Sequence, residues 1–247
     1  MVCRLCKKEK AKLCKAHLIP ESFYRFMYPD NKSGGRPLKM VVHDLDYVRK
    51  TRIGLYDDSI LCASCDNQLG VLDEYGKNIL LDTTPRLVYN TEEGRIFTLE
   101  NVDGARLLEF FLSVLWRCSI SNLNELSRVN LGPKFEKKIE KIVLGDLSEL
   151  FDFSTVVRRY DFVNEGYKKM FYLPIPQKIG GINYYNLSFP NGYKVLIKVD
   201  SRSQPMELIP FTLKSGAPVC VVTTEKFEET VEYSITQKKA NAIRRTF

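Results

Sequence analysis

The spacing of apolar residues along the chain predicts three helices. Between residues 103 and 121 they recur every three or four positions, and Asp103 is a residue type favoured at a helix N-cap. A second helix is expected to begin at Pro133, since proline suits a first turn, and to end at Gly145. A third is expected to begin near Cys65 and to run to about Tyr75.

Alternation of apolar and polar residues predicts strands on either side of these helices. Residues 39–55 alternate in part, and residues 184–199 alternate around Pro190-Asn191-Gly192, which is typical of a hairpin turn. Residues 211–222 and 230–235 are expected to form two further strands. The whole pattern predicts an α+β fold with a β-rich carboxy-terminal part.

The composition is that of a globular protein. The chain has 247 residues, of which 44% are hydrophobic and 27% charged. Its longest apolar stretch, residues 107–116, contains Glu109 and is far shorter than the ~20 residues that span a bilayer, so no membrane association is expected. The first residues lack the apolar segment of a signal peptide. We therefore expect a cytoplasmic protein, whose cysteines are metal ligands or buried thiols rather than disulfides.

Charge is distributed unevenly along the chain. Residues 1–56 carry 13 basic and 5 acidic side chains, a net charge of +8, whereas residues 57–99 carry 3 basic and 8 acidic ones, a net charge of −5. A basic segment of this kind favours a polyanionic partner such as nucleic acid. The candidate contacts are Lys7, Lys8, Lys12 and Lys15. The alternative is that these lysines are simply solvated.

Four of the seven cysteines occur as two Cys-x-x-Cys pairs, Cys3 with Cys6 and Cys62 with Cys65. Tetrahedral zinc takes four thiolates, and each such pair supplies two from one tight turn. A redox dithiol would follow a strand, and Cys3 lies too near the start of the chain for that. The sequence therefore predicts a structural zinc site. The three remaining cysteines lack partners at ligand spacing and are expected to be packed thiols: Cys14, Cys118 and Cys220.

The segments around these pairs resemble the zinc-containing branch of the HNH, or ββα-metal, endonucleases. In that family a first Cys-x-x-Cys is followed by a His-Ile-x-Pro-like segment, then by Asn-Leu-x-x-Leu-Cys-x-x-Cys and an Asn or His. This chain has A-H-L-I-P at residues 16–20, D-D-S-I-L-C at residues 57–62 and C-D-N-Q-L-G at residues 65–70. The resemblance covers about a third of the chain. It also extends to bacterial proteins that join such a head to a longer carboxy-terminal part and have been linked to phage defence.

The resemblance implies a treble-clef or ββα-metal zinc head over residues 1–80. An α+β domain over residues 81–247, with two helices and a β-rich carboxy-terminal part, would then serve substrate positioning, self-association or partner docking. The implied activity is hydrolysis of phosphodiester bonds in nucleic acid, with DNA favoured, by an effector of an antiviral defence system that acts with a partner protein. A homo-oligomer is compatible with this activity.

The resemblance also implies roles for individual residues. His17 would be the general base that activates water, and a neutral imidazole suits that role near neutral pH. Asp66, which follows the last zinc cysteine, would bind the catalytic Mg²⁺ or Mn²⁺, with Asn67 beside it. The zinc ion would be structural and would hold the hairpin against the helix.

Three positions depart from the family pattern. Ala16 stands where an aspartate commonly binds the catalytic metal, and Asp57 or Asp58 stands where an asparagine orients the histidine. Asp66 replaces the terminal Asn or His, and aspartate is a good ligand for hard cations. Either Asp57, Asp58 or Glu21 compensates for Ala16, or the site is degenerate.

Each candidate also has a structural interpretation. His17 could be a further zinc ligand or a hydrogen-bonded structural histidine, and Asp66 could cap the helix that begins near Cys65. For His43 the structural role is favoured. Two functions therefore stand: a metal-dependent HNH-like endonuclease, which we favour, and a non-catalytic zinc module that binds nucleic acid or a protein partner.

Overall fold

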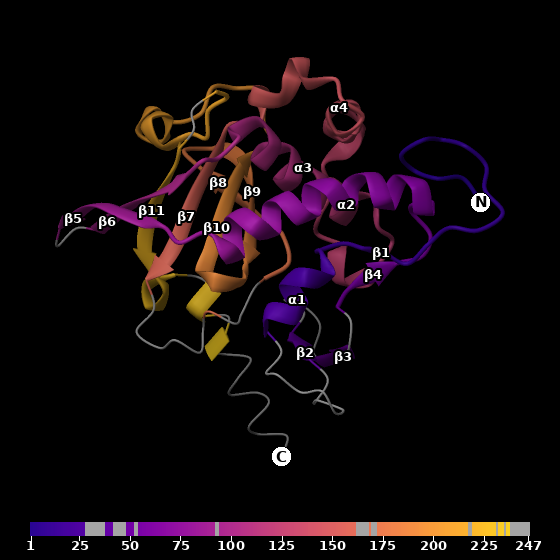
Figure 1. The fold of residues 1–247 in the computed structure, drawn as a ribbon, viewed down its shortest axis with the longest axis horizontal. Helices are drawn as coiled ribbons and strands as arrows, with labels where there is room; N and C mark the ends of the chain where they lie inside the picture. Colours follow the sequence, from indigo (N-terminus) through magenta and orange to yellow (C-terminus); the bar gives the residue numbers. More distant parts are fainter. Residues whose placement is uncertain are drawn as a thin grey trace.

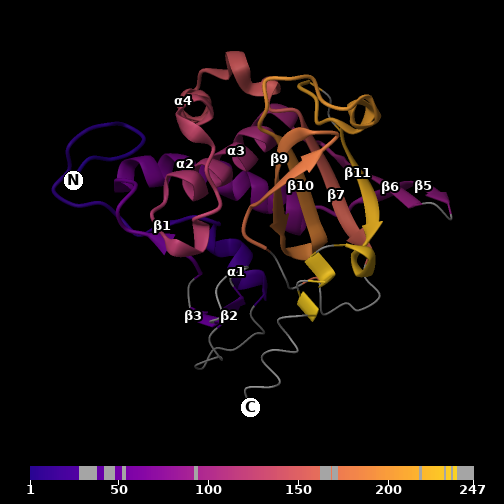
Figure 2. The same ribbon diagram turned by 180° about the vertical axis from the view of Figure 1, so that it is seen from behind.

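The computed structural model describes residues 1–27, 38–41, 48–51, 54–91, 94–161, 168, 172–216, 219–230, 232–234 and 236–237. It is a mixed α+β structure with one large sheet and helices packed on one face, which Figures 1 and 2 show from opposite sides. The predicted α+β class is therefore confirmed. We call residues 1–80 the head and residues 81–247 the body.

A seven-stranded sheet forms the centre of the body, in the strand order β5-β6-β11-β7-β10-β9-β8. Strands β11 and β7 are parallel, and all other neighbours are antiparallel. The strands are β5 (Arg86–Thr91), β6 (Gly94–Glu100), β7 (Thr155–Asp161), β8 (Ile175–Ile179), β9 (Ile182–Phe189), β10 (Tyr193–Lys198) and β11 (Val219–Lys226). In Figure 1 the β5–β6 hairpin projects from the molecule at the end opposite the N-terminal loop.

The predicted hairpin around residues 190–192 is confirmed. Strands β9 and β10 pair antiparallel across it, from Tyr193 opposite Phe189 onward. Asn191 and Gly192 both have positive φ, 63° and 82°, a conformation that asparagine and glycine adopt most readily. Every residue of β10 is buried, so this hairpin lies in the middle of the structure.

The three predicted helices are also confirmed. They are α2 (Ala63–Lys77), α3 (Gly104–Ile120) and α4 (Gly132–Val143). The Asp103 side chain caps α3 by accepting a hydrogen bond of 3.1 Å from the backbone N–H of Arg106. Pro133 lies in the first turn of α4, and Gly145 follows its end with φ of 102°.

Within the described residues of the head, the elements other than α2 are short. Strand β1 (Ala16–His17) pairs antiparallel with β4 (Tyr56–Asp57), and helix α1 (Glu21–Met27) follows β1. Strands β2 (Leu38–Val41) and β3 (Val48–Thr51) form a hairpin, so the prediction of strand in residues 39–55 is confirmed in part. His43 lies outside the described residues.

Two strand predictions near the carboxy-terminal end need correction. Residues 232–234 form a helical turn instead of a strand, because the Thr230 hydroxyl accepts a hydrogen bond of 3.3 Å from the backbone N–H of Tyr233 and so caps the turn. In residues 211–222 the strand begins only at Val219, since Gly216 has φ of 71° and turns the chain before it.

The main hydrophobic core lies between the helices and the inner face of the sheet. One continuous cluster of buried side chains joins head and body, from Cys3 to Val222. At its centre four phenylalanine rings pack with centroids 5.2–5.9 Å apart: Phe23, Phe110, Phe111 and Phe189. The boundary between domains near residue 80 stays a prediction, because apolar packing runs across it.

The outer face of the sheet is covered by short segments. A small apolar cluster packs there under the 3₁₀ helix Met206–Phe211. Beyond it the buried Lys194 ammonium pairs with Glu225 at 2.9 Å and with Glu232 at 3.2 Å. A charge buried in this way needs such partners. Among the described residues no helix is long and apolar enough to cross a membrane.

Candidate metal centre

The two Cys-x-x-Cys pairs, 56 residues apart at their closest, meet at one point in the head. The Sγ atoms of Cys3, Cys6, Cys62 and Cys65 all lie within 4.8 Å of one another, and those of Cys6 and Cys62 are 4.0 Å apart. Tetrahedral zinc with Zn–S bonds of about 2.3 Å places its sulfur atoms about 3.8 Å apart. The four cysteines are free rather than disulfide-bonded. This cluster could therefore hold a zinc ion.

Backbone hydrogen bonds shape both halves of the cluster. The first pair occupies a tight turn, in which the Lys7 N–H donates to the Cys3 carbonyl at 3.0 Å and Lys7 has φ of 57°. The second pair opens α2, where the Asp66 N–H donates to the Cys62 carbonyl at 3.0 Å. The halves are joined by a hydrogen bond of 2.8 Å from the Arg4 N–H to the Ile60 carbonyl.

The environment of the thiols differs from one to the next. Burial opposes ionisation of Cys3, but hydrogen bonds from the backbone N–H groups of Cys62, Cys6 and Leu5 outweigh it and lower the Cys3 pKa to about 6. Burial, together with the neighbouring cysteines, raises the pKa of Cys65. The lowered pKa favours the thiolate form of Cys3, which is the form that binds metal.

Beside this cluster the structure brings His17 and Asp66 together. His17 is on β1 opposite Tyr56 of β4, and Asp66 is in the first turn of α2. Burial raises the pKa of the Asp66 carboxyl and the Asp73 charge adds to this, whereas electrostatic interactions with Arg117 and with His17 lower it. The Asp66 carboxyl is therefore close enough to the His17 imidazole and to the Arg117 guanidinium to interact electrostatically with both.

Asp57 is buried and its carboxylate accepts four hydrogen bonds. Its Oδ1 accepts from the Ser59 N–H at 2.8 Å and the Ser59 hydroxyl at 2.6 Å, and its Oδ2 accepts from the Ser121 hydroxyl at 2.7 Å and the Asn122 N–H at 3.3 Å. Burial opposes its ionisation, but these donors outweigh burial and lower the Asp57 pKa. This side chain ties β4 to the end of α3.

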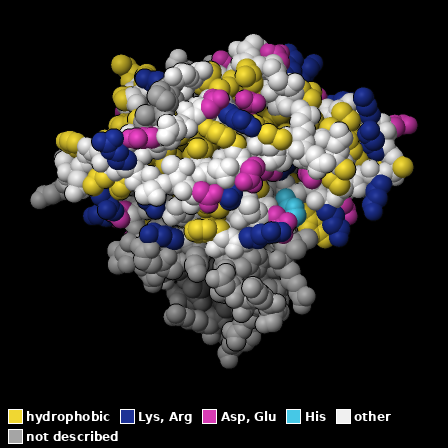
Figure 3. Space-filling view, in the orientation of Figure 1, with side chains coloured by type: hydrophobic (Ala, Val, Ile, Leu, Met, Phe, Trp, Pro, Cys, Tyr) yellow, Lys and Arg dark blue, Asp and Glu magenta, His cyan; other side chains and the backbone are white. Residues whose placement is uncertain are grey.

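The remaining candidates lie at the surface. Asp58 and Asn67 are exposed, as are all four candidate lysines. Figure 3 shows Lys and Arg side chains gathered at the end of the molecule where the N-terminal loop lies. Lys7 is engaged within the chain, because its ammonium lies 2.6 Å from the Glu140 carboxylate of α4. Lys15 lies over the Tyr56 ring, with its Nζ 5.2 Å from the ring centroid.

The sequence predictions overlooked Arg117 and Asp73. The Arg117 side chain, 1% exposed, donates to the Asp73 carboxylate at 2.9 and 2.6 Å and to the His17 carbonyl at 3.0 Å. A signal for Arg117 was present, since it is a lone charge within an apolar helical stripe. Asp73 follows Asp66 by two helical turns and so lies on the same face of α2.

Outside the zinc cluster the other cysteines are packed. Burial raises the pKa of Cys118 and of Cys220 to about 12. The half-buried Cys14 donates to the Leu61 carbonyl at 3.4 Å, and burial raises its pKa to about 11. Among the described residues the four-cysteine cluster is also the only group of three or more His, Cys, Asp or Glu side chains placed closely enough to hold a metal ion.

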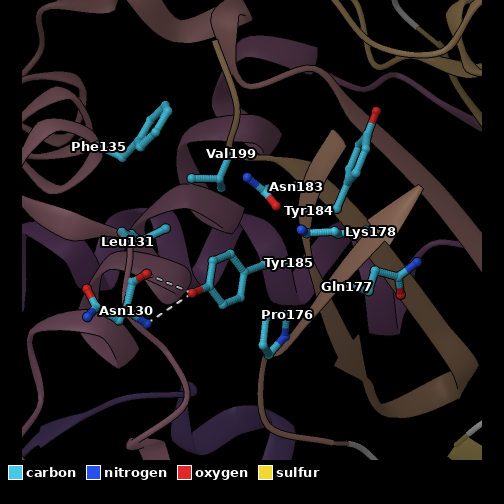
Figure 4. A pocket seen from close by; sticks show the side chains of 10 residues that line it. All are labelled: Asn130, Leu131, Phe135, Pro176, Gln177, Lys178, Asn183, Tyr184, Tyr185 and Val199. Atoms are coloured by element: carbon cyan, nitrogen blue, oxygen red, sulfur yellow. Dashed lines mark hydrogen bonds between the residues drawn. The ribbon is translucent and has the colours of Figure 1, made fainter. Parts of the chain in front are cut away.

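The body contains a separate pocket of about 510 Å³, shown in Figure 4. The Tyr185 ring stands at its base, and its hydroxyl donates to the Asn130 carbonyl at 2.9 Å and accepts from the Asn130 N–H at 3.0 Å. The pocket is lined by Asn130, Leu131, Phe135, Pro176, Gln177, Lys178, Asn183, Tyr184, Tyr185 and Val199. All of these belong to the body, so the pocket is distinct from the His17–Asp66 site.

Comparison of the chain with protein-family models, with curated proteins and with solved structures finds no match.

Proposed function

We propose that this protein is a metal-dependent HNH-like endonuclease that hydrolyses phosphodiester bonds of nucleic acid, with DNA favoured. The observation that supports this is the meeting of His17 and Asp66. His17 lies on a short strand of an antiparallel pair, and Asp66 lies in the first turn of the helix that begins at the second Cys-x-x-Cys pair, close enough to interact electrostatically with His17. This order of strand, strand and helix resembles a ββα-metal, or treble-clef, head.

The four cysteines have a structural role in this proposal. Zinc held by their sulfurs would join the N-terminal turn to the start of α2, which fixes Asp66 relative to the strand pair. No chemical step passes through this ion. Its loss would therefore disorganise the site without removing a reacting group.

His17 is proposed as the general base. Its imidazole would take a proton from the water that attacks the phosphorus atom, a transfer that contributes about 10²–10⁴-fold to the rate in enzymes. Mg²⁺ or Mn²⁺, when bound, would neutralise charge on the phosphate oxygens and the leaving oxygen. Asp66 is the residue that would hold that ion. Asp57 is already saturated by its four donors, so we assign it to holding β4.

A specific observation favours the second candidate function, a zinc module that binds without cleaving. Among the described residues, His17 and Asp66 belong to no group of three or more metal-ligating side chains placed closely enough to hold an ion. Ala16 is buried and has no ligand atom. Such a module would bind nucleic acid through the exposed lysines of the head, and its affinity would fall steeply with salt because each phosphate contact releases counterions.

Cleavage of plasmid and linear DNA, and of RNA, with Mg²⁺ or Mn²⁺ tests the nuclease. We expect His17→Ala and Asp66→Ala to lose ~10²-fold or more in rate while retaining zinc and nucleic-acid affinity. The matched control is Glu74→Ala, which removes an exposed carboxylate from the same helix. Salt-dependent binding without cleavage in the wild type, with either metal, would establish the binding module instead. Loss of zinc in His17→Ala would make His17 structural.

A further inference from the structure

The end of helix α3 contacts three elements of the head, β1, α2 and β4, which carry His17, Asp66 and Asp57. Arg117 donates to the His17 carbonyl of β1 and to Asp73 of α2, and Ser121 donates to Asp57 of β4. We propose that Arg117, Asp73, Ser121 and Asp57, here called the α3 clamp, position the His17 imidazole for catalysis. Helix α3 would then be part of the active head although it belongs to the body. This inference rests on the proposed function.

Arg117 uses four of its five N–H donors within the protein. Its Nη1 donates to the His17 carbonyl at 3.0 Å and to Asp73 Oδ2 at 2.9 Å, while its Nη2 donates to Asp73 Oδ1 at 2.6 Å. Its Nε donates to the Ser113 carbonyl of its own helix at 3.3 Å. With 1% of its surface exposed, it can act on the reaction only through the groups it holds. Arg117 is therefore a positioning residue.

The strand pair that carries His17 is too short to be stable by itself. Strands β1 and β4 have two residues each, and isolated strand pairs of even greater length are marginal in water. The clamp holds each strand by its own bond: Arg117 holds the His17 carbonyl, and Ser121 with the Asn122 N–H holds Asp57, which is the register partner of Ala16. The bond to that carbonyl fixes the backbone from which the imidazole projects, because the carbonyl carbon and the side chain are attached to the same Cα.

Helix α3 also couples this geometry to the sheet. Phe110 and Phe111, one and a half to two turns before Arg117, pack on Phe189 of β9 with ring centroids 5.5 and 5.8 Å apart. A shift of α3 on the sheet would move the His17 carbonyl and the Asp57 carboxylate together. The structural role of the body then includes holding the general base, and the head alone would be a poor catalyst.

Steady-state cleavage and histidine NMR of the full chain test the clamp. The variant Arg117→Leu removes the bonds to His17 and Asp73. The variant Arg117→Lys keeps the positive charge but has a single donor nitrogen in place of the guanidinium fork. Val114→Ala is the matched control, since Val114 is fully buried on the same helix and its truncation removes apolar packing but no hydrogen bond to His17. The chain has two histidines, so a His43→Gln variant assigns the His17 resonances in ¹⁵N-histidine-labelled protein.

We expect Arg117→Leu to lower kcat on the order of 10²-fold with KM within about twofold, to shift the His17 ring resonances and to retain zinc. Arg117→Lys should recover part of kcat, and Val114→Ala should leave kcat and the resonances unchanged. If Arg117→Leu does not fold, Ser121→Ala, which keeps the Arg117–Asp73 pair, should give a smaller fall in kcat and a smaller shift.

Unchanged His17 resonances in Arg117→Leu and in Ser121→Ala would overturn the clamp, as would equal losses of kcat in Arg117→Leu and Val114→Ala. The two proposals fail separately. A wild type that never cleaves removes the nuclease, whereas the NMR comparison still decides whether the clamp sets the position of His17.

Discussion

The head and the body share one apolar core, but the head also depends on closely spaced thiols and directional polar contacts. The body is a seven-stranded sheet whose inner face and covering helices bury a large apolar core. In the head, apart from α2, short elements are joined by four closely spaced thiols, by a buried Arg117–Asp73 pair and by hydrogen bonds to Asp57. Hydrophobic burial tolerates small shifts, but metal and hydrogen-bond geometry does not. A region that depends on such directional contacts can hold its side chains in defined positions even where its strands and helices are short.

The substitution with the largest expected effect separates the stability of the head from that of the body. Cys62→Ser should release zinc and unfold the head, because binding of structural zinc by cysteines supplies on the order of 10 kcal/mol to folding. The body should keep its sheet. Elemental analysis and amide hydrogen exchange by segment would measure both. A folded, reduced wild type without zinc would contradict the assignment of the cluster.

The second prediction concerns a substitution in the apolar core of the body instead of the metal centre of the head. Phe111→Ala removes a fully buried ring and should cost about 3–5 kcal/mol of unfolding free energy. Zinc content should stay the same in the native protein. Denaturant unfolding followed by far-UV circular dichroism and by zinc release measures this. Simultaneous release of zinc at the shifted midpoint would show that head and body unfold as one unit.

A smaller effect is expected where head and body meet. A Cβ atom at Gly76 of α2 would lie 2.4 Å from the Phe110 ring of α3, so Gly76→Ala should cost about 1–3 kcal/mol through overpacking. Gly70 provides the control on the same helix, since a Cβ there meets nothing within 4 Å. Gly70→Ala should be neutral or stabilising by up to about 1 kcal/mol. Equal melting temperatures for the two variants would show that the interface is loose.

The smallest expected effect depends on pH. Burial opposes ionisation of Asp57, but its donors outweigh burial and hold its pKa below the ordinary value of 3.8 in the folded protein. Its contribution to stability is therefore present above about pH 4 and lost as pH falls through the lowered pKa. Asp57→Asn should cost on the order of 1 kcal/mol at pH 7 and less at pH 3. The exposed Asp58→Asn serves as control, and a pH-independent cost would refute this role for Asp57.

Much of the fold could be predicted from local patterns. The helices α2, α3 and α4 and the β9–β10 hairpin each show a clear apolar period. Local signals also mark the start of α3 at Asp103, the end of α4 at Gly145 and the hairpin turn at Asn191. The β5–β6 hairpin was missed because β5 is exposed throughout and shows no alternation. The turn at residues 232–234 was mistaken for a strand because its cap depends on the single Thr230 hydroxyl.

The four cysteines of the candidate metal centre could be named from the sequence alone, because Cys-x-x-Cys spacing is a local property that each tight turn satisfies by itself. The nearness of His17 to Asp66 was expected only through a resemblance. The roles of Asp57 and Arg117 were decided by the tertiary structure alone. Two of the four donors to Asp57 come from Ser59 nearby, but the other two lie 64 and 65 residues away, and Arg117 reaches a carbonyl 100 residues away. Contacts of that length leave no period or motif in the chain, because they depend on how α3 packs across the head.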